Sequence, residues 1–591
     1  MQNLKDKSQF IGIILIACAF LLMLKFPDQQ RGSGHAQTIT SDKTSPDEQI
    51  SNNILPNEQL ASEIAEKEQT FFIENDVIKV ALSNISGAIK SVALKNYQAS
   101  QGKDDVVVFN DGNDLNALAI SFGKWDPNKF RGDGVYSLIS HEKGNIKFKR
   151  SFDDGYDVIR EYSVCANDSK ETDGYIIKSK IYVENTSSNH IQIGDMNIFI
   201  GAMPTTESDA RGDYLSFGIF DGKKDKFISL EDFRERNGFL GFGKREAKSY
   251  FSGYGKYEWG SIKNQFFTAV FTPSTLSDGY VACPMQLKNT VTGKIEDCVS
   301  ASMIFHVGEL GPGSKFELAS DFYVGPKNFS RLSAMGKEQG RIMQFGFFGA
   351  ISELLLRMMV WIHGVIPNWG LAIIVLTTLV KLLLWPLTNA QVKSSKKMAS
   401  IQEPLKAIRE RYKNNPQKLQ SETLKLFREN NVNPAAGCLP ILIQIPIFFG
   451  LYYMLRTTSD LRFAHFLWIK DLSMPDSIAH IKSFPINILP IFMGITMFLQ
   501  MHMTPMPTAD NSQRIMFKLM PMIFLFGCYN LPSGLILYWT VQNLLTIIQQ
   551  YAVSRRKGSQ LIAVSAKNTK KDFREGNSKK RSSAQHLLKK N

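Results

Sequence analysis

The residues of this sequence that are most suited to a chemical role are polar side chains inside otherwise apolar runs. Lys381 directly follows the uncharged run 371–380. A charge near the middle of a bilayer costs on the order of 3 kcal/mol on insertion scales, so an ionisable residue in such a place is a functional hypothesis by default. Thr377 lies one helical turn from Lys381 on the same face. The two residues predict a short polar stripe on an otherwise apolar helix.

Snorkelling is the simpler explanation for Lys381. Pro386 is only roughly 7–8 Å further along a helix, so the lysine stem could nearly reach a membrane surface. Function is nevertheless favoured from this run alone. None of the apolar runs contains a carboxylate that could pair with Lys381, and a lone cation needs water, so a hydrated cavity is implied. The missing carboxylate also argues against an ion-coupled transporter.

Further polar residues occur in two other apolar runs. Gln444 stands between two prolines, and the last run contains Tyr538, Trp539 and Gln542. Tyr538 and Gln542 share a helix face because they are four residues apart.

Motifs for cofactor or metal chemistry are missing from the sequence. It contains no P-loop, no HExxH, no nucleophile elbow and no Cys/His spacing typical of a metal site. We therefore expect no metal, no cofactor and no enzyme activity. Asp153 and Asp154 are interpreted as a solvated turn rather than a catalytic pair. Cys283 and Cys298 could form a disulfide if their domain faces an oxidising compartment, and the sequence leaves this open.

Apolar runs close to membrane length divide the 591 residues. Residues 10–24 are flanked by lysines, which predicts an uncleaved N-terminal transmembrane anchor over 1–25. Five later runs approach the ~20 residues that a spanning helix needs; they are 367–388, 437–455, 484–502, 515–530 and 533–552. With six spans the basic segments 1–9, 386–436 and 553–591 all fall on the cytoplasmic side, as the positive-inside rule requires.

The region between the anchor and the later runs is polar. Residues 26–70 are typical of a flexible tether, and residues 71–330 contain many short β-type runs that predict an all-β sandwich. Residues 331–366 are expected to form a linker and an interfacial amphipathic helix, in which Glu353 and Arg357 can pair. The net charge of +14 is concentrated outside this region, so specific DNA binding is not expected.

A helical hairpin is predicted over 389–433, with a break at 414–416. A coiled-coil seam runs from Met398 to Tyr412 at 3,4 spacing. The first helix is basic, which either reflects topology alone or marks a docking arm; its basic residues are Lys393, Lys396, Lys397, Arg409 and Arg411. The tail 553–591 has 12 basic and 2 acidic residues and could contact ribosomal RNA or anionic lipid.

Four motifs in order resemble the YidC/Oxa/Alb family of membrane protein insertases in its Gram-negative form. They are Trp385-Pro386-Leu387-Thr388, the run from Asn433 to Phe448 (NPAAGCLPILIQIPIF), Leu467-Trp468-Ile469-Lys470-Asp471-Leu472, and the run from Leu531 to Trp539 (LPSGLILYW). The resemblance covers about 365–552.

This resemblance implies a multi-domain α+β membrane protein of the bacterial inner membrane. It implies a periplasmic β-supersandwich, a five-helix transmembrane insertase core over 367–552 and cytoplasmic termini. A positively charged hydrophilic groove would be formed by Lys381, Thr377, Gln444, Tyr538, Trp539 and Gln542. Lys381 stands where most members have arginine, so a planar hydrogen-bond network is in doubt while attraction of acidic tails should survive.

The resemblance also implies partners. The protein would insert and help to fold nascent inner-membrane proteins, alone or with the Sec translocon, in contact with lipids and with the ribosome or signal recognition particle. A multi-span transporter or channel with a periplasmic domain is the alternative, and a carbohydrate-active β domain on an anchor is a third hypothesis.

Overall fold

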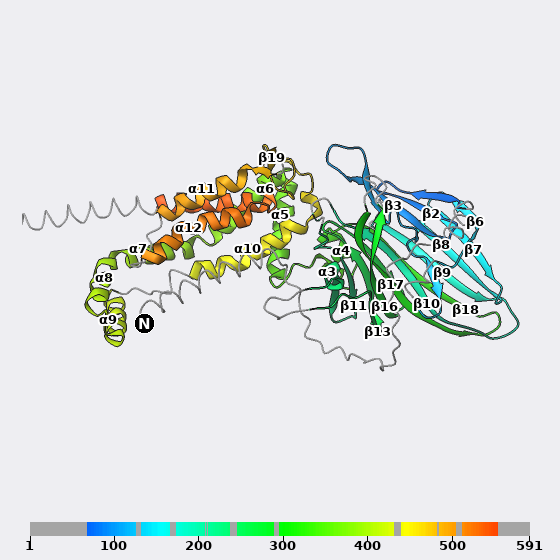
Figure 1. Cartoon of the computed structure of the whole chain (residues 1–591). Coiled ribbons are helices and arrows are strands. Elements are labelled where there is room, and N and C mark those ends of the chain that lie inside the picture. The colour runs from blue at the N-terminus through cyan, green and yellow to red at the C-terminus, as the bar shows by residue number, and fades with distance from the viewer. Residues whose placement is uncertain are drawn as a thin grey trace, which may run out of the picture. The chain divides into compact units, whose positions relative to one another are not determined.

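The computed structural model describes residues 68–552, apart from gaps at 126–131, 166–172, 207–208, 210, 237–244, 289–294, 431–438, 482–483 and 504–510. These residues form two compact units (Figure 1). The β unit comprises residues 68–344 with Thr457–Asp460, and the helical unit comprises Phe345–Arg456 with residues 461–552. The predicted anchor 1–25, nearly all of the predicted tether 26–70 and the basic tail 553–591 lie outside the described residues.

Strands dominate the β unit because its sequence alternates between apolar and polar residues. In β9 (Ile176–Asn185), Ile177 and Ile181 are buried, while Lys178 and Lys180 are exposed. Such alternation places every second side chain in the core. The prediction of a mostly β-sheet domain is confirmed.

Three antiparallel sheets make up the β unit. The nine-stranded sheet has, in spatial order, β12 (Asp225–Ser229), β11 (Ser216–Phe220), β14 (Trp259–Lys263), β15 (Phe267–Pro273), β18 (Lys315–Pro326), β9, β8 (Tyr156–Val164), β7 (Asn145–Phe152) and β6 (Ser137–Glu142). The five-stranded sheet has β13 (Phe251–Tyr257), β16 (Ser277–Lys288), β17 (Ile295–Leu310), β10 (Ile191–Pro204) and β5 (Ile120–Phe122). The four-stranded sheet has β1 (Thr70–Glu74), β2 (Ile78–Ser83), β3 (Ala88–Gln98) and β4 (Val106–Phe109).

The two larger sheets pack face to face, with β10 and β17 against β14. A Cβ atom added to Gly260 of β14 would lie 2.7 Å from the Met303 sulfur and 2.9 Å from the Ile200 Cδ1. Phe271 and Phe305 meet edge to face across the same interface at 6.2 Å. The interior is therefore close-packed, and a glycine is needed where the sheets approach most closely.

Two features that the sequence left for the structure to decide lie in this unit. Cys283 and Cys298 are both free, because their cross-strand partners are Ser300 and Met285 rather than each other. Burial raises the pKa of the Cys283 thiol to about 12. The Asp153-Asp154 pair lies exposed in the turn between β7 and β8, as predicted.

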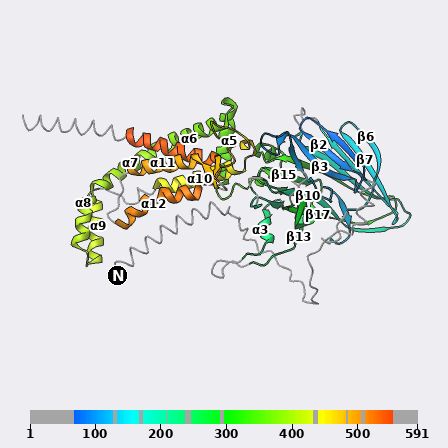
Figure 2. The ribbon, with the colours of Figure 1, turned by 45° about the horizontal axis from the view of Figure 1, so that its top comes forward.

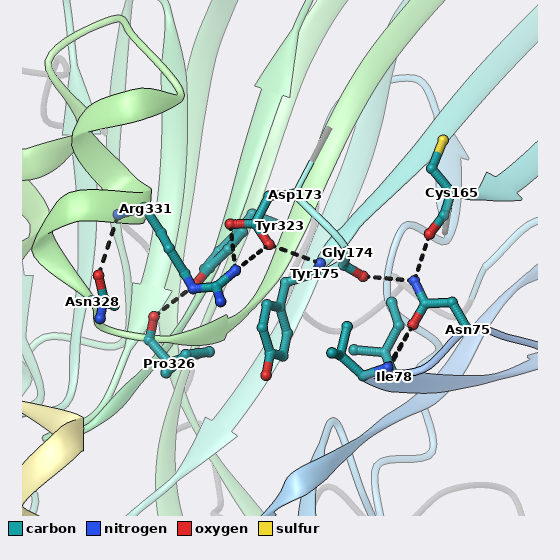
Figure 3. Close-up of polar contacts among 11 residues, drawn as sticks. Asn75, Ile78, Cys165, Asp173, Gly174, Tyr175, Tyr323, Pro326, Asn328 and Arg331 are labelled. Atoms are coloured by element: carbon teal, nitrogen blue, oxygen red, sulfur yellow. Dashed lines mark hydrogen bonds and ion pairs between the residues drawn. The ribbon is translucent and has the colours of Figure 1, made fainter. Parts of the chain in front are cut away.

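The segment that leads into β9 is held from two sides, as Figure 3 shows. On one side Arg331 makes two hydrogen bonds of 2.8 and 2.9 Å with the Asp173 carboxylate. On the other side the Asn75 amide donates to the carbonyl oxygens of Cys165 and Gly174, both at 2.8 Å. The α4 helix (Phe329–Ala334), which carries Arg331, is thereby fixed to the sheets.

The chain that follows β18 stays bound to the β unit through residue 344. It forms α4 and the 3-10 helix η2 (Gln339–Met343); the unit has one other short helix among its described residues, α3 (Leu230–Phe233). The Lys263 ammonium donates to the Ile342 carbonyl at 2.7 Å and to the Gln344 side chain. The Trp259 indole donates to the Lys337 carbonyl at 2.9 Å.

Two lysines are fully buried in this region. Lys263 is 2% exposed and Lys327 is 1% exposed. Burial lowers the pKa of Lys327 to about 7, with the nearby Asp209 carboxylate opposing the shift. Burial, followed by repulsion from Lys327, holds the pKa of Lys263 well below its usual value. Neither lysine is among the residues that form an ion pair within the described part of the chain.

The helical unit consists of helices and one small hairpin. Its elements are α5 (Gly349–Val365), α6 (Trp369–Leu383), α7 (Trp385–Ser400), α8 (Gln402–Arg411), α9 (Pro416–Glu429), α10 (Leu439–Thr457), β19 (Ser477–Ile481), β20 (Phe484–Asn487), α11 (Ile488–Met503) and α12 (Asn511–Cys528). A last helix covers residues 533–552 and is called the C-terminal helix here. Figures 1 and 2 show α8 and α9 at one end of this bundle and the β19 end opposite.

Several helix boundaries differ from those predicted. The run 367–388 is two helices, because the chain leaves helical geometry at Leu384 and restarts with Pro386 in the first turn of α7, where a missing N–H costs nothing. Within the predicted segment 331–366 the amphipathic helix covers Gly349–Val365, because Gln344 and Gly346 have positive φ angles that a helix cannot accommodate. Within α5 the predicted ion pair is confirmed, with Arg357 and Glu353 2.8 Å apart.

The predicted two-helix hairpin contains three helices. The chain breaks at Ile401, and Pro404 then falls in the first turn of α8, where its missing N–H is tolerated. Asn415 caps α9 by accepting a hydrogen bond from the Lys418 backbone at 3.1 Å. The predicted seam does pack: Met398 and Ile401 are buried against α9.

Among the helices that the structure describes, none combines 18 residues with enough hydropathy to cross a membrane. The number of spans therefore stays a prediction, as does the anchor.

An ordered loop, residues 461–476, covers one end of the bundle. The backbone N–H groups of Ser533 and Gly534, which begin the C-terminal helix, donate to this loop at 2.8 and 2.9 Å. The Asp476 carboxylate accepts from the Trp468 indole at 3.1 Å and from the Leu489 backbone at 2.7 Å. The loop is thus bonded to two helices and closes this end.

Gly370 allows the same loop to approach α6. A Cβ atom there would lie 2.2 Å from the Phe466 ring, which is 9% exposed. We expect Gly370→Ala to destabilise the protein by about 1–3 kcal/mol, because such overpacking forces ring or backbone to shift. Thermal unfolding in detergent measures the effect.

A matched control exists in α5. A Cβ atom on Gly364 would meet nothing within 4 Å, so Gly364→Ala should be neutral or stabilising. The double variant Gly370→Ala/Phe466→Ala should lose less stability than the two single variants together. Equal unfolding temperatures for Gly370→Ala and Gly364→Ala would contradict the proposed clash.

Candidate functional site

The C-terminal helix is the hub of the helical unit. Its side chains are hydrogen-bonded to four other helices: α6, α7, α10 and α11. Its first turns are apolar and buried, with Leu535 and Ile536 at most 1% exposed. Pro532 stands just before this helix and its carbonyl accepts from the Ile536 backbone at 3.3 Å, at a place where a missing N–H costs nothing.

A polar stripe runs along this helix. It consists of Tyr538, Gln542, Thr546 and Gln549, whose spacing of four, four and three residues places them on one face. Each member is hydrogen-bonded to a side chain of another helix or to a neighbour that is so bonded.

The Lys381 ammonium belongs to this stripe. Lys381 is 4% exposed and donates to the Thr546 hydroxyl at 2.8 Å. Thr546 in turn donates to the backbone carbonyl of Gln542 at 2.7 Å, so its oxygen is free to accept from the lysine. No ion pair of Lys381 occurs in the described part of the chain. The lysine therefore does not snorkel: its charge is held inside the bundle by a neutral hydroxyl.

Gln444 of α10 meets the stripe one turn away. Its amide donates to the Tyr538 hydroxyl, and its carbonyl accepts from the Gln542 amide at 3.4 Å. Tyr538 is 2% exposed. The three residues that the sequence singled out in two separate runs are thus brought together.

Two other predicted residues are placed differently. The Thr377 hydroxyl, 1% exposed, donates to the Ile373 carbonyl of its own helix at 2.6 Å. The Trp539 ring points to the aromatic side of the helix, where it packs against Phe448 at 4.8 Å and Phe524 at 5.1 Å. Thr377 and Trp539 therefore border the stripe.

Sequence reasoning missed Thr546 and Gln549. The Gln549 amide, 1% exposed, donates to the Thr388 hydroxyl at 2.7 Å and to the Asn389 side chain at 3.2 Å. The signal was available, because Thr546 is four residues after Gln542 and Gln549 is three residues after Thr546, so both continue the helix face of Tyr538 and Gln542. What the sequence did not supply was the partner of each residue on α6 and α7.

The predicted docking residues lie on α7 and α8. Lys397 and Arg411 are exposed, and Arg409 is partly buried. The side chains of Lys393 and Lys396 lie outside the described ones. Arg411 stacks over the neighbouring Tyr412 ring at 5.8 Å.

The outer faces of α6, α11, α12 and the C-terminal helix are apolar. Exposed large side chains gather on α6, α11, α12 and the C-terminal helix: Leu379, Leu382, Leu383, Ile491, Phe492, Ile495, Phe498, Leu499, Met522, Phe526, Leu544 and Ile548. A water-soluble bundle would carry polar residues there, whereas a bilayer favours this surface. Among the described residues no group of His, Cys, Asp and Glu is placed to hold a metal ion.

Comparisons with known proteins agree over both units. Residues 71–358 match the family model described as "YidC periplasmic domain", and residues 361–560 match the model described as "60Kd inner membrane protein". The chain is 31% identical over 487 residues to the membrane protein insertase YidC of Geobacter sulfurreducens, covering 80% of this chain and 84% of that one. It is 29% identical over 571 residues to the YidC of Pelobacter propionicus, covering 93% and 99%.

A solved structure is also similar. The crystal structure of an active YidC insertase with its first transmembrane domain resolved covers 82% of this chain and 93% of its own, at 19% identity and a TM-score of 0.33. The two family models and the Geobacter relative show an inner-membrane protein with a periplasmic domain. This chain belongs to the YidC family of membrane protein insertases.

Proposed function

We propose that the polar stripe with Lys381 and Gln444 lines a hydrophilic groove that receives the polar tail of a nascent membrane protein. The observation that carries the proposal is the Lys381 ammonium, buried in the bundle and held by the hydroxyl of Thr546. A buried cation without a carboxylate partner is costly unless water or an incoming anion compensates it. An acidic substrate tail would supply that charge.

The apolar part of the substrate would travel along the outer surface next to this site. Leu382 follows Lys381 directly and is 56% exposed, and Ile548 lies two residues beyond Thr546 and is 59% exposed. The transfer of an apolar segment from water into the lipid beside these residues is favourable, because it removes apolar surface from water. Polar groups in the groove meanwhile lower the cost of moving the tail partway across.

The end of the bundle covered by loop 461–476 would face the periplasm. The Asp476 and Ser533 contacts of this loop support a groove that is closed on that side. In this topology both termini, α8 and α9 are cytoplasmic. The α5 helix lies along the periplasmic surface of the inner membrane, and five helices span this membrane after an N-terminal anchor. Thr377 and Trp539 would border the groove.

Partners follow from the same arrangement. Lys397, Arg409 and Arg411, together with Lys393 and Lys396, would provide a basic docking surface on α7 and α8 for the RNA or acidic proteins of a ribosome or signal recognition particle. The apolar faces of α11 and α12 suit lipid or the Sec translocon. The β unit up to residue 344 would be the periplasmic domain, and the tail 553–591 would be cytoplasmic.

Site-specific photo-crosslinking tests the groove. A photoreactive residue at Leu382 of α6 should crosslink to a stalled single-span substrate with an acidic tail. The matched control is Phe498 of α11, which is 47% exposed and equally apolar but carries no link to the stripe. Equal crosslinking at the two positions would show that the substrate has no preference for the Lys381 side.

A further inference from the structure

The hydroxyl of Thr546 occupies an unusual position in the polar stripe. It is the single hydrogen-bond partner of the Lys381 ammonium among the described residues, at 2.8 Å. An ammonium has three donors, so two N–H groups remain without a protein acceptor in that part of the chain. The hydroxyl proton is committed to the Gln542 carbonyl at 2.7 Å, which orients the oxygen lone pairs away from that carbonyl.

Lysine needs such a partner more than arginine would. Its ammonium is a point charge on a flexible stem, whereas a guanidinium has a rigid fork that can be held by several acceptors. Without a partner inside the bundle, the stem would carry the charge toward the nearest water. Lys381 lies in the last turn of α6, close to the helix end at Leu383, so that escape route is short.

We propose that Thr546 is the positioning residue of the groove cation, which keeps the Lys381 ammonium inside the bundle and leaves two N–H donors for a carboxylate of the incoming tail. This inference rests on the proposed function of the polar stripe. It assigns to Thr546 a role in selecting acidic tails that no single helix pattern reveals, since the two residues are 165 positions apart.

The first variant is Thr546→Val, which keeps the shape and removes the acceptor. In cells depleted of the wild-type protein, insertion of a single-span substrate with an acidic tail should fall by about ten- to a hundredfold, the size expected for one hydrogen bond to a charged group. Insertion of the same substrate with a neutral tail should hardly change. Thr546→Ser should restore acidic-tail insertion, because serine keeps the hydroxyl.

Thr540→Val is the matched control. Thr540 is on the same helix, is 8% exposed and donates to the Ile536 carbonyl at 2.8 Å, the same backbone bond that Thr546 makes. It has no bond to Lys381 in the described structure. A loss of acidic-tail insertion in Thr540→Val equal to that in Thr546→Val would mean that the hydroxyl-to-backbone bond matters, not the lysine, and would overturn the inference.

Lys381→Met separates this inference from the proposed function. If Lys381→Met impairs acidic tails while Thr546→Val does not, the groove cation stands and the role of Thr546 falls. If Lys381→Met impairs neither substrate, the groove itself is wrong. If Lys381→Met and Thr546→Val both impair acidic-tail insertion, the Lys381→Arg/Thr546→Val double variant should recover much of the activity, because an arginine depends less on one acceptor. Failure of that recovery would assign the Thr546→Val defect to packing.

Discussion

Replacing Lys381 with glutamate is expected to abolish the insertion of single-span substrates with an acidic translocated tail. The change puts a carboxylate beside Thr546, in a bundle whose described polar stripe contains no second cation. The groove would then repel acidic tails and carry an uncompensated buried charge. Lys381→Arg should support nearly normal insertion, and Lys381→Met should lie between the two.

The measurement is protease accessibility of the tail in cells depleted of the wild-type protein, with acidic and neutral tails compared. Lys406→Glu is the charge-reversal control, because Lys406 is exposed on α8, far along the chain from the stripe. The abundance of each variant in the membrane reports on folding. If Lys381→Glu inserts acidic tails as well as the wild type, the buried ammonium has no steering role.

The buried lysines of the β unit should make its stability depend on pH. The pKa of Lys327 falls to about 7 in the folded protein from an ordinary value of 10.5. Between these values the unfolded chain binds more protons than the folded one, so stability rises with pH across the window from about 7 to 10.5. Each such group contributes a slope of up to about 1.4 kcal/mol per pH unit.

Lys327→Met should therefore stabilise the protein at pH 7 and flatten this rise. Part of the rise in stability with pH should remain in this variant, because burial also lowers the pKa of Lys263. Removing Lys327 also removes the repulsion that lowers the Lys263 pKa, so the remaining rise of stability with pH should be smaller than in the wild type. Urea unfolding of the full chain in detergent at pH 7, 8.5 and 10 measures the effect.

Lys223→Met is the control for this series, since Lys223 is an exposed lysine in the turn between β11 and β12. It should leave both the midpoint and the slope unchanged. A Lys327→Met protein that is less stable than the wild type at pH 7, with the same pH slope, would show that the ammonium is compensated in the folded state.

Local patterns predicted most of the secondary structure. The alternation in β9 and the apolar runs of α6 and α10 are periodicities of neighbouring residues, and such signals survive without knowledge of the fold. The errors arose at boundaries. Helices break at Leu384 and Ile401, although the apolar or coiled-coil pattern continues through both residues. A bend that is set by packing and by a nearby proline leaves the hydrophobic pattern almost unchanged.

The sequence also predicted Lys381, Gln444, Tyr538 and Gln542, because polar groups in apolar runs are conspicuous. It could not decide whether Lys381 snorkels. That choice depends on whether an acceptor lies within reach, and the acceptor, Thr546, is contributed by another helix. The same reason hid Gln549, whose partners Thr388 and Asn389 are about 160 residues away.

The sequence by itself determined that this chain has an acidic β-rich domain, apolar helices and a cation among them, since composition and periodicity are local properties. Only the tertiary structure decided that Cys283 and Cys298 stay unpaired, that Lys263 and Lys327 are buried, and that Trp539 turns away from the polar stripe. Each of these depends on strand register or helix rotation, which bring together residues far apart in the chain. A shift of one residue in strand register, or a rotation of a helix by about 100°, changes such contacts while the local pattern stays the same.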